Sequence, residues 1–226
     1  MAAAVEVAVV LPAFNERARI ASVLAAVGAL RLPERAKLIV VDDGSADGTA
    51  EAAEAAGALV VSHRVNLGKG AALLTGVEAA VAAGAELVVL IDADGQHDPA
   101  DLPLLLEPLR EGRADLVLGY RRFTGAMPPA MRLGNTVLSR IFAALFGLRL
   151  RDTQCGFRAL TAAACRSLRW TALDYSVETE MLVHAARRRL RVEEVPVATV
   201  YHDRYKGTTA VDGLRILASM LRWRLA

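Results

Sequence analysis

The chain has 226 residues, of which 54% are hydrophobic and 5% aromatic, and its formal net charge at pH 7 is +2. This length fits one large domain with a sizeable core, and the nearly balanced charge excludes the strongly basic character of many nucleic-acid-binding proteins, so we expect no nucleic-acid partner. No apolar run approaches the ~18–20 uninterrupted residues of a membrane span.

The cysteines and the N-terminal stretch indicate the compartment. Cys155 and Cys165 match no metal-ligand spacing and make no disulfide framework, so we expect reduced thiols. The first 16 residues lack a basic segment and meet a charged residue at Glu6, so they predict no signal peptide. We therefore expect a cytoplasmic protein, or one placed peripherally at the cytoplasmic face of a membrane.

The first half of the chain alternates apolar runs with helical patterns. A helix ending at Ala56 is expected to be capped by Ser45 or Asp47. Strand–helix alternation with short loops is typical of an α/β domain with a mainly parallel sheet. Strands are predicted at 7–11, 36–41, 59–62, 87–91 and 115–118, and further helices at 16–30, 68–83 and 101–110.

After Gly119 the pattern changes and basic residues become more frequent. The segment 130–150 sets arginines among large apolar residues, and 213–226 reads as an amphipathic helix. The segment 192–200 predicts a strand interrupted by Pro196, which is typical of an edge strand or of a twisted one. The two basic amphipathic segments are either core helices with an exposed basic stripe or helices that lie at a bilayer interface.

Polar clusters follow three of the predicted strands, at the point where each strand ends. They are Asn15-Glu16, Asp42-Asp43 and Asp92-Ala93-Asp94. In parallel α/β sheets, ligands bind outside the carboxyl ends of the strands. We therefore expect the three clusters to form one site.

The segment 92–99, DADGQHDP, carries the strongest chemical signal. Two carboxylates one residue apart at the end of a buried strand are costly to desolvate unless a cation compensates them. Mg²⁺ or Mn²⁺ takes carboxylate oxygens and leaves coordination positions open for phosphate. Gly95 permits the sharp turn, Gln96 offers a further oxygen, and His97 is expected to shape the turn.

Two other motifs point to a nucleotide. Pro12, Phe14 and Glu16 are able to flank a nucleoside, and Asp42 either accepts from a base or ribose or forms an Asx turn. In the glycine-rich turn 64–73, backbone amides are placed to meet an anion, with Lys69 as a point charge. This turn is neither a Walker loop nor a complete dinucleotide fingerprint, and a purely structural turn is the alternative.

Four motifs of the first half, in their order and at their intervals, resemble the family 2 glycosyltransferases with the GT-A fold. They are VVLPAFNE (9–16), VDDGSADGT (41–49), NLGKG (66–70) and DADGQHDP (92–99). Five later segments resemble the dolichyl-phosphate mannosyltransferase and polyprenyl-phosphate glycosyltransferase branch of this family. They are GYRR (119–122), RLGNTVLSRIF (132–142), DTQCGFRAL (152–160), ETEML (178–182) and EVPVATVYHDRYKGTT (194–209). The resemblance extends to about Thr209. It implies a Rossmann-like, mostly parallel central sheet flanked by helices, with a catalytic domain at 1–210 and a C-terminal amphipathic helix at 211–226.

The resemblance also implies site residues and ligands. The ligands are a GDP- or UDP-sugar donor, a polyprenyl (dolichyl or undecaprenyl) phosphate acceptor, and Mg²⁺ or Mn²⁺. The metal is assigned to Asp92, Asp94 and Gln96, and the acceptor phosphate to Arg121, Arg132 and Thr136, where Thr136 stands in place of an expected serine. Donor binding is assigned to Pro12, Phe14, Glu16, Asp42, Asp43, Lys69, Asp92, Ala93, Asp94 and Arg204, and catalysis to Asp92, Asp94, Arg121, Arg132 and Arg204.

The expected reaction is an inverting transfer of mannose or glucose. A polyprenyl phosphate, with a second pKa near ~6, is already largely anionic at neutral pH and needs no strong base. A sugar hydroxyl would need one, with Glu178, Glu180 and Asp98 as candidates, although the two glutamates also suit a helix N-terminus. The alternatives are a family 2 enzyme acting on a saccharide or small-molecule hydroxyl, and a non-catalytic nucleotide-sugar-binding protein. Since this sequence has no C-terminal membrane spans like those of many relatives, we expect peripheral membrane contact.

Overall fold

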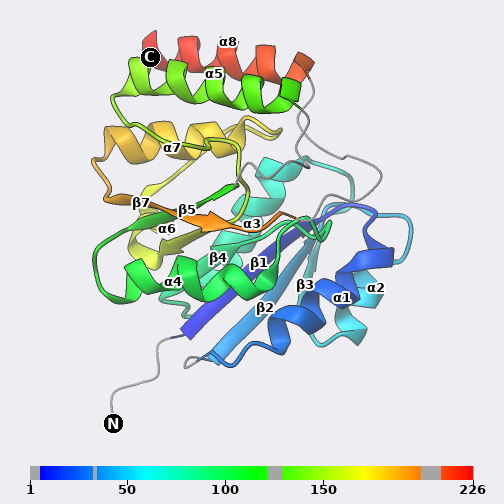
Figure 1. Ribbon diagram of the computed structural model, residues 1–226. Helices are drawn as coiled ribbons and strands as arrows, with labels where there is room; N and C mark the ends of the chain where they lie inside the picture. The colour runs from blue at the N-terminus through cyan, green and yellow to red at the C-terminus, as the bar shows by residue number, and fades with distance from the viewer. Residues whose placement is uncertain (1–5, 33–34, 122–128, 200–209, 226) are drawn as a thin grey trace.

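The structure is a computed structural model that describes residues 6–32, 35–121, 129–199 and 210–225, with only the backbone described at 35, 129–131 and 210 (Figure 1). Its centre is a seven-stranded sheet in the order β3-β2-β1-β4-β6-β5-β7. All neighbouring strands are parallel except β6, which runs antiparallel to both β4 and β5. The strands are β1 (Glu6–Ala13), β2 (Arg35–Asp42), β3 (Leu59–Ser62), β4 (Leu87–Leu90), β5 (Leu116–Arg121), β6 (Arg158–Thr161) and β7 (Val192–Val197).

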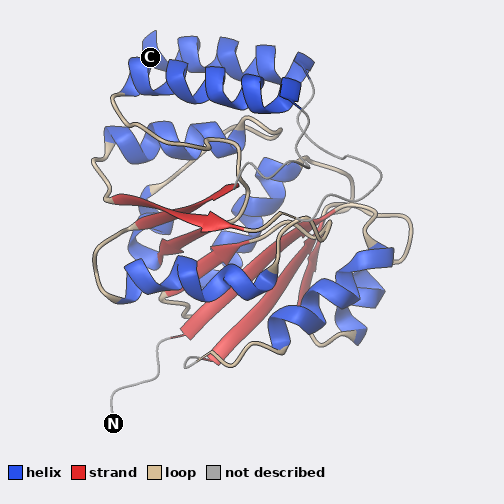
Figure 2. Cartoon of the chain, viewed as in Figure 1, coloured by secondary structure: helices blue, strands red, loops and turns tan. Residues whose placement is uncertain are grey.

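Helices cover both faces of this sheet (Figure 2). The apolar side chains of β1 alternate between the two faces, because successive residues of a strand point in opposite directions. Val7, Val9 and Leu11 join one core cluster, and Ala8 and Val10 join the other. The helices are α1 (Arg17–Gly28), α2 (Thr49–Ala55), α3 (Lys69–Ala82), η1 (Pro99–Asp101), α4 (Leu102–Arg110), α5 (Pro129–Phe146), α6 (Ala162–Ser167), α7 (Val177–Arg187) and α8 (Ala210–Leu225).

The helices α1, α2 and α4 contribute to the core on one face, and α3, α6 and α7 to the core on the other. The helices α5 and α8 pack side by side and form a further layer outside α7 (Figure 1). Phe142 of α5 and Met220 of α8 reach the shared core and are fully buried. Within the described residues, no helix is long and apolar enough to cross a membrane.

The α/β class and the mainly parallel sheet are confirmed, and each of the five strands predicted in the first half is present as β1 to β5. The predicted edge strand is also present: β7 contains Pro196 and lies at one end of the sheet. It ends at Val197, and within the described residues a single bridge between Thr199 and His97 follows it. β5 continues beyond the predicted Leu118 to Arg121, which places that arginine on a strand.

Two sequence expectations were wrong. β6 was not predicted, because this four-residue strand contains Arg158 and shows no apolar alternation. Neither Ser45 nor Asp47 is the N-cap residue of α2, because that position is held by Gly48. Instead, Asp47 accepts hydrogen bonds from the backbone N–H groups of Arg17 and Thr49, and Ser45 accepts one from Asn15, so these side chains join the starts of two helices.

Candidate active site

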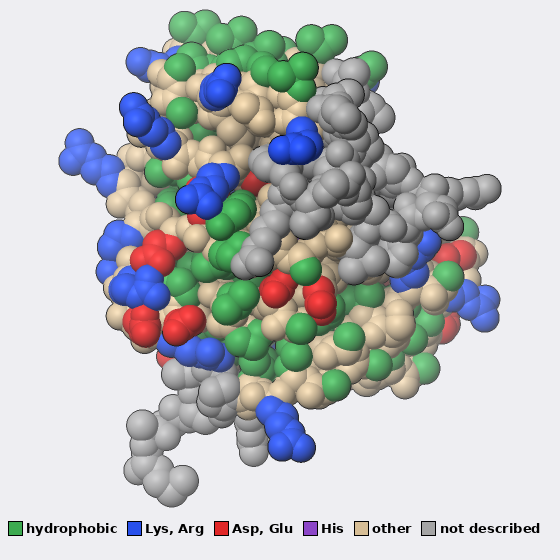
Figure 3. Space-filling view, in the orientation of Figure 1, with side chains coloured by type: hydrophobic (Ala, Val, Ile, Leu, Met, Phe, Trp, Pro, Cys, Tyr) green, Lys and Arg blue, Asp and Glu red, His purple; other side chains and the backbone are tan. Residues whose placement is uncertain are grey.

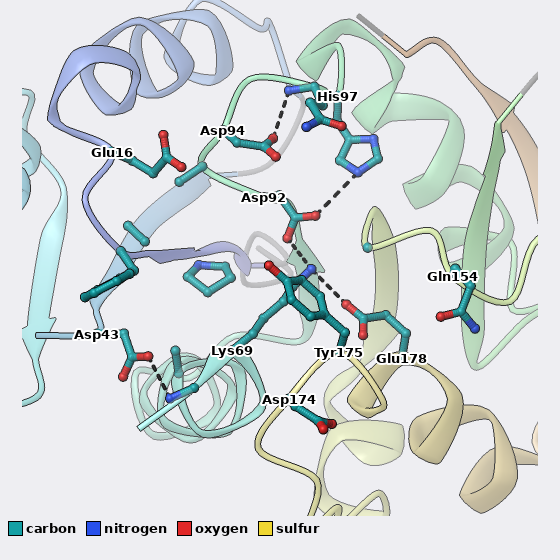
Figure 4. A pocket seen from close by; sticks show the side chains of 18 of the residues that line it. Glu16, Asp43, Lys69, Asp92, Asp94, His97, Gln154, Asp174, Tyr175 and Glu178 are labelled. Carbon is teal, nitrogen blue, oxygen red and sulfur yellow. Dashed lines mark hydrogen bonds and ion pairs between the residues drawn. The ribbon is translucent and has the colours of Figure 1, made fainter. Parts of the chain in front are cut away.

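A cavity of about 780 Å³ opens at the carboxyl ends of β1 and β4 (Figure 4). It brings together residues from both halves of the chain, as expected for ligand binding at this edge of a parallel sheet. Asp42, Arg132 and Thr136 are not in its lining, and Arg204 lies outside the described residues. The predicted site residues that line it are Pro12, Phe14, Glu16, Asp43, Lys69, Asp92, Ala93, Asp94, Gln96 and Arg121.

Lys69, the first residue of α3, joins two carboxylates in this cavity. Its Nζ lies 2.7 Å from Asp92 Oδ1 and 2.8 Å from Glu178 Oε1. Burial opposes charge on the ammonium, but the charges of Asp92 and Glu178 outweigh it and raise the pKa of Lys69. Burial likewise opposes charge on Asp92, but Lys69 and His97 hold the pKa of that carboxyl well below its usual range. The predicted point charge of Lys69 is therefore directed at carboxylates of the protein itself.

Asp94 stands two residues further along the same loop. Its Oδ1 accepts a hydrogen bond from the Gln96 N–H at 3.0 Å, and Gly95 between them has φ of +71°, as the predicted sharp turn requires. Burial and the nearby charge of Asp92 raise the pKa of Asp94. His97 is buried, with its Nε2 3.7 Å from Asp92 Oδ2 and its ring 5.3 Å from that of Phe157.

This donor set suits a divalent cation that is shared with a substrate. The described residues contain no group of three or more His, Cys, Asp and Glu side chains able to hold a metal. Asp92, Asp94 and Gln96 nevertheless line one wall of the cavity. Mg²⁺ is ordinarily held by one or two carboxylates together with substrate phosphates, and this arrangement matches that pattern.

Asp43 organises the glycine-rich loop. Its carboxylate accepts hydrogen bonds from the N–H groups of Leu67 at 2.9 Å and Gly68 at 2.8 Å, and contacts His63 Nδ1 at 2.7 Å. The N–H of Gly70 donates to the carbonyl of Leu173. The amides of Leu67 and Gly68 therefore meet an anion of the protein itself, the Asp43 carboxylate, and that of Gly70 meets a backbone carbonyl, so these three amides follow the structural alternative.

The two glycines of this turn are explained by close packing. A Cβ at Gly68 would lie 2.3 Å from the carbonyl oxygen of Leu173, and one at Gly70 would lie 1.9 Å from that of Ala172. Asp42 likewise follows its structural alternative, since it accepts from the N–H of Ser45 and does not line the cavity. Both features fix loop geometry around the site.

Replacement of Asp43 by asparagine is expected to lower the free energy of unfolding by about 1–3 kcal/mol, because an amide NH₂ would face a backbone donor of the loop. Urea denaturation measures the change. Glu51→Gln, at an exposed acid on α2, is the matched control. An Asp43→Asn midpoint equal to that of the wild-type protein would show that the loop does not depend on this carboxylate.

Arg121 and Asp152 form a bidentate ion pair at the far side of the cavity. The Nε–Oδ2 distance is 2.7 Å and the Nη2–Oδ1 distance is 3.0 Å. Burial opposes ionisation of Asp152, but Arg121 outweighs it and lowers the pKa of that carboxyl. The partner Asp152, only 1% exposed, was not predicted, and its place in DTQCGFRAL was the only sequence signal for it.

Arg121 also lines a second cavity, of about 560 Å³, beside α5. Thr136 lies in this second cavity, and its Oγ1 donates to the carbonyl oxygen of Arg132 at 2.7 Å. Arg132 is exposed and lines neither cavity. Among the described residues, its lining contains no acidic side chain, and besides Arg121 it includes three more arginines: Arg140, Arg149 and Arg151.

Of the three candidate bases, only Glu178 lines the main cavity. Glu180 accepts hydrogen bonds from the backbone N–H groups of Thr171 and Ala172, and Asp98 accepts from Ala100. The sequence reasoning did not assign Gln154, Asp174 or Tyr175 to the site, although all three line it (Figure 4). They lie near β6 and before α7, where no periodic pattern marks the strand ends.

Comparisons with known proteins agree with this geometry. Residues 8–169 match the family model described as glycosyl transferase family 2. UDP-N-acetylglucosamine--dolichyl-phosphate N-acetylglucosaminyltransferase of Methanococcus voltae is 30% identical and covers 96% of this chain and 95% of its own. Undecaprenyl-phosphate mannosyltransferase of Micrococcus luteus is 33% identical, over 96% of this chain and 93% of its own.

A solved structure is similar over nearly the whole chain. Glucosyl-3-phosphoglycerate synthase from Mycobacterium tuberculosis, in complex with Mn²⁺, UDP and phosphoglyceric acid, has a TM-score of 0.78 and 26% identity. The similarity covers 99% of this chain and 79% of that one. The family model spans more than half of the present sequence, and the fold is that of the GT-A glycosyltransferases. The chain belongs to glycosyl transferase family 2 and is a glycosyltransferase.

Proposed function

We propose that this enzyme transfers a hexose, mannose or glucose, from a GDP- or UDP-sugar to a polyprenyl phosphate, with inversion at the anomeric carbon and with Mg²⁺ or Mn²⁺ as cofactor. The observation that carries the proposal is the junction of two cavities at Arg121. One cavity contains the carboxylates Asp92 and Asp94, and the described lining of the other includes four arginines and no acid. A donor diphosphate with its metal suits the first, and an acceptor phosphate suits the second.

The donor nucleoside is assigned to the end of the main cavity near Pro12, Phe14 and Glu16. Phe14 is 44% exposed there and offers an apolar face to a base. Asp94 and Gln96, with Asp92, would hold the metal, which when bound neutralises charge on the departing nucleoside diphosphate. Arg204, in a segment outside the described residues, is proposed to approach the same diphosphate.

The acceptor phosphate is assigned to the junction at Arg121. It is largely anionic at neutral pH, so the reaction requires alignment more than proton removal. Guanidinium groups bind phosphate through paired N–H donors, and Asp152 holds Arg121 in a fixed orientation. Arg132 and Thr136 belong to α5, which forms one wall of the second cavity.

Peripheral membrane contact, at the cytoplasmic face, is proposed for the layer formed by α5 and α8. Figure 3 shows hydrophobic side chains across the top of this layer, with Lys and Arg side chains below them. Apolar residues that enter the interface, beside arginines that meet anionic headgroups, are the pattern of interfacial helices. Among the described side chains, the large apolar residues exposed on the two helices are Leu133, Val137, Val211, Leu214, Leu221 and Leu225.

Replacement of Arg132 by alanine is expected to raise KM for polyprenyl phosphate about tenfold and to leave KM for the donor within about twofold. Arg132 lines neither cavity in this structure, so the prediction tests the proposal that its guanidinium contacts the acceptor phosphate when the acceptor is bound. Steady-state kinetics with each substrate varied in turn measures both values. Arg166→Ala, at an exposed position on α6, is the control. Equal changes in both constants would remove Arg132 from the acceptor site.

The proposed function is tested by transfer of radiolabelled sugar. GDP-mannose and UDP-glucose are offered separately, with Mg²⁺ or Mn²⁺, to polyprenyl phosphate in detergent. Label that enters the organic phase supports the lipid acceptor and identifies the donor. Metal-dependent hydrolysis of one donor without a lipid product would contradict the lipid acceptor and favour a small-molecule acceptor, for which phosphoglyceric acid is the first candidate to test.

A further inference from the structure

Glu178 presents a buried carboxylate oxygen to the main cavity. The residue is 4% exposed, belongs to the first turn of α7 and lines the cavity (Figure 4). Its Oε1 lies 2.8 Å from the ammonium of Lys69. Its Oε2 is buried and has no hydrogen-bond partner among the residues that the structure describes.

A buried carboxylate oxygen without a donor is costly, and native proteins almost always supply one. Two basic side chains contact Glu178, and neither donates to Oε2. The guanidinium of Arg158 donates to the backbone carbonyl of Glu178, not to its carboxylate. The nearest cation, Lys69, is already shared between Oε1 and Asp92. The missing donor is therefore expected from a bound molecule.

The position of Glu178 identifies the chemical group that donates. A single ammonium contacts both Glu178 and Asp92, so the two carboxylates lie at neighbouring points of the cavity. The donor diphosphate is assigned to Asp92 and Asp94, and the hexose is the next group along that substrate. Tyr175, 44% exposed on the same wall, adds an aromatic face beside this position. Hydroxyl groups are the hydrogen-bond donors of a hexose.

We infer that Oε2 of Glu178 accepts a hydrogen bond from one hydroxyl group of the donor hexose, so that Glu178 selects sugars by the position of that hydroxyl. This inference rests on the proposed function. Lys69 fixes Oε1, and the remaining oxygen is thereby held in one orientation. A site built to bond a hydroxyl rejects analogues that lack it, because its own buried polar group is then left without a partner.

Glu178→Gln is the informative substitution. The amide has the same shape and keeps a carbonyl oxygen for Lys69, but it places an NH₂ donor where Oε2 stands. Isothermal titration calorimetry compares the GDP- or UDP-sugar with the corresponding free nucleoside diphosphate, for wild-type and variant protein. The affinity for the nucleotide sugar is expected to fall about 10- to 100-fold, whereas that for the free diphosphate stays within about twofold.

Deoxy donors give the second measurement. In a series of nucleotide sugars that each lack one hydroxyl, one member is expected to bind wild-type protein about 10- to 100-fold more weakly than the parent sugar. The same member is expected to lose little further affinity with Glu178→Gln, because the contact is already absent. Every deoxy donor giving the same wild-type-to-variant ratio would overturn the inference.

Glu180→Gln is the matched control, two residues further along the same helix. Its carboxylate is also buried, but it binds the backbone of Thr171 and Ala172 and does not line the cavity. The Glu180→Gln substitution is expected to lower the midpoint of thermal unfolding. The ratio between the affinity for the nucleotide sugar and the affinity for the free nucleoside diphosphate is expected to stay unchanged. If Glu178→Gln lowers the affinity for the nucleotide sugar and for the free nucleoside diphosphate by the same factor, Glu178 only positions Lys69 and the inference is overturned.

The two proposals fail in different ways. If wild-type protein binds neither GDP- nor UDP-sugars, the proposed function is wrong and the inference falls with it. If wild-type protein binds one of them, and Glu178→Gln leaves the ratio of the two affinities unchanged, only the inference is wrong.

Discussion

Replacement of Asp94 by alanine is expected to lower turnover by at least about 1,000-fold, because metal-assisted stabilisation of the leaving diphosphate contributes several kcal/mol. Asp94 is the less neutralised of the two carboxylates: it makes no salt bridge in the described part of the chain, whereas Asp92 is held by Lys69. Its raised pKa reflects burial beside another negative charge, which a divalent cation would relieve. The measurement is initial-rate sugar transfer at saturating donor and metal.

Asp98→Ala is the control for this experiment. Asp98 lies four residues further along the same loop, but it caps η1 and lines neither cavity. Its removal is expected to leave turnover within about threefold, since only one partly exposed capping bond is lost. Near-normal activity of Asp94→Ala would contradict the proposed metal site. Loss of activity in Asp98→Ala instead would favour a carboxylate base and a hydroxyl acceptor.

Replacement of Arg158 by methionine is expected to lower the free energy of unfolding by about 3–5 kcal/mol, because three buried carbonyl groups lose their donor. The guanidinium is 1% exposed and donates to the carbonyl oxygens of Cys155 at 2.8 Å, Glu178 at 2.7 Å and Thr153 at 3.0 Å. Burial lowers the pKa of Arg158, so its charge is retained at a cost that these contacts offset. Urea denaturation gives the change.

Arg158→Lys separates the charge from the fork geometry. An ammonium keeps the positive charge but lacks the planar fork that serves three carbonyls, so an intermediate loss of stability is expected. A loss below about 1 kcal/mol in Arg158→Met would mean that the freed carbonyls find other partners. Because Arg158 joins the 153–155 segment to the start of α7, the methionine variant is also expected to weaken donor binding through Glu178.

The sequence predicted the first half of the molecule well for a physical reason. Most of β1, the end of β2 and all of β4 are buried, so they form the apolar runs 7–11, 38–41 and 87–91, and the polar residues that follow mark the strand ends. Accordingly, Asp92, Asp94 and Glu16 line the same cavity, as expected for residues that follow parallel strands. Local pattern was sufficient there, because parallel strands end at a common edge.

The second half depends on contacts between distant residues, which no local pattern reports. β6 carries a fully buried arginine, so its composition does not resemble that of a strand. The ion pairs of Lys69 with Glu178 and of Arg121 with Asp152 became visible only when the fold brought these segments together. Likewise, the glycine-rich turn has the sequence pattern of an anion site, but its backbone N–H groups already donate to Asp43 and Leu173.

The reversed strand β6 has a consequence for redesign of this enzyme. It lies between β4 and β5, so the chain returns from its second half into the middle of the sheet. The segment before it brings Gly156 against Asp92, where a Cβ would lie 2.6 Å from Oδ2. A chimaera that joins the first half of this enzyme to the second half of a relative would thus replace a central strand and one wall of the donor site together. Exchange of acceptor specificity between relatives is better attempted by grafting α5 alone, because that helix lies outside the sheet.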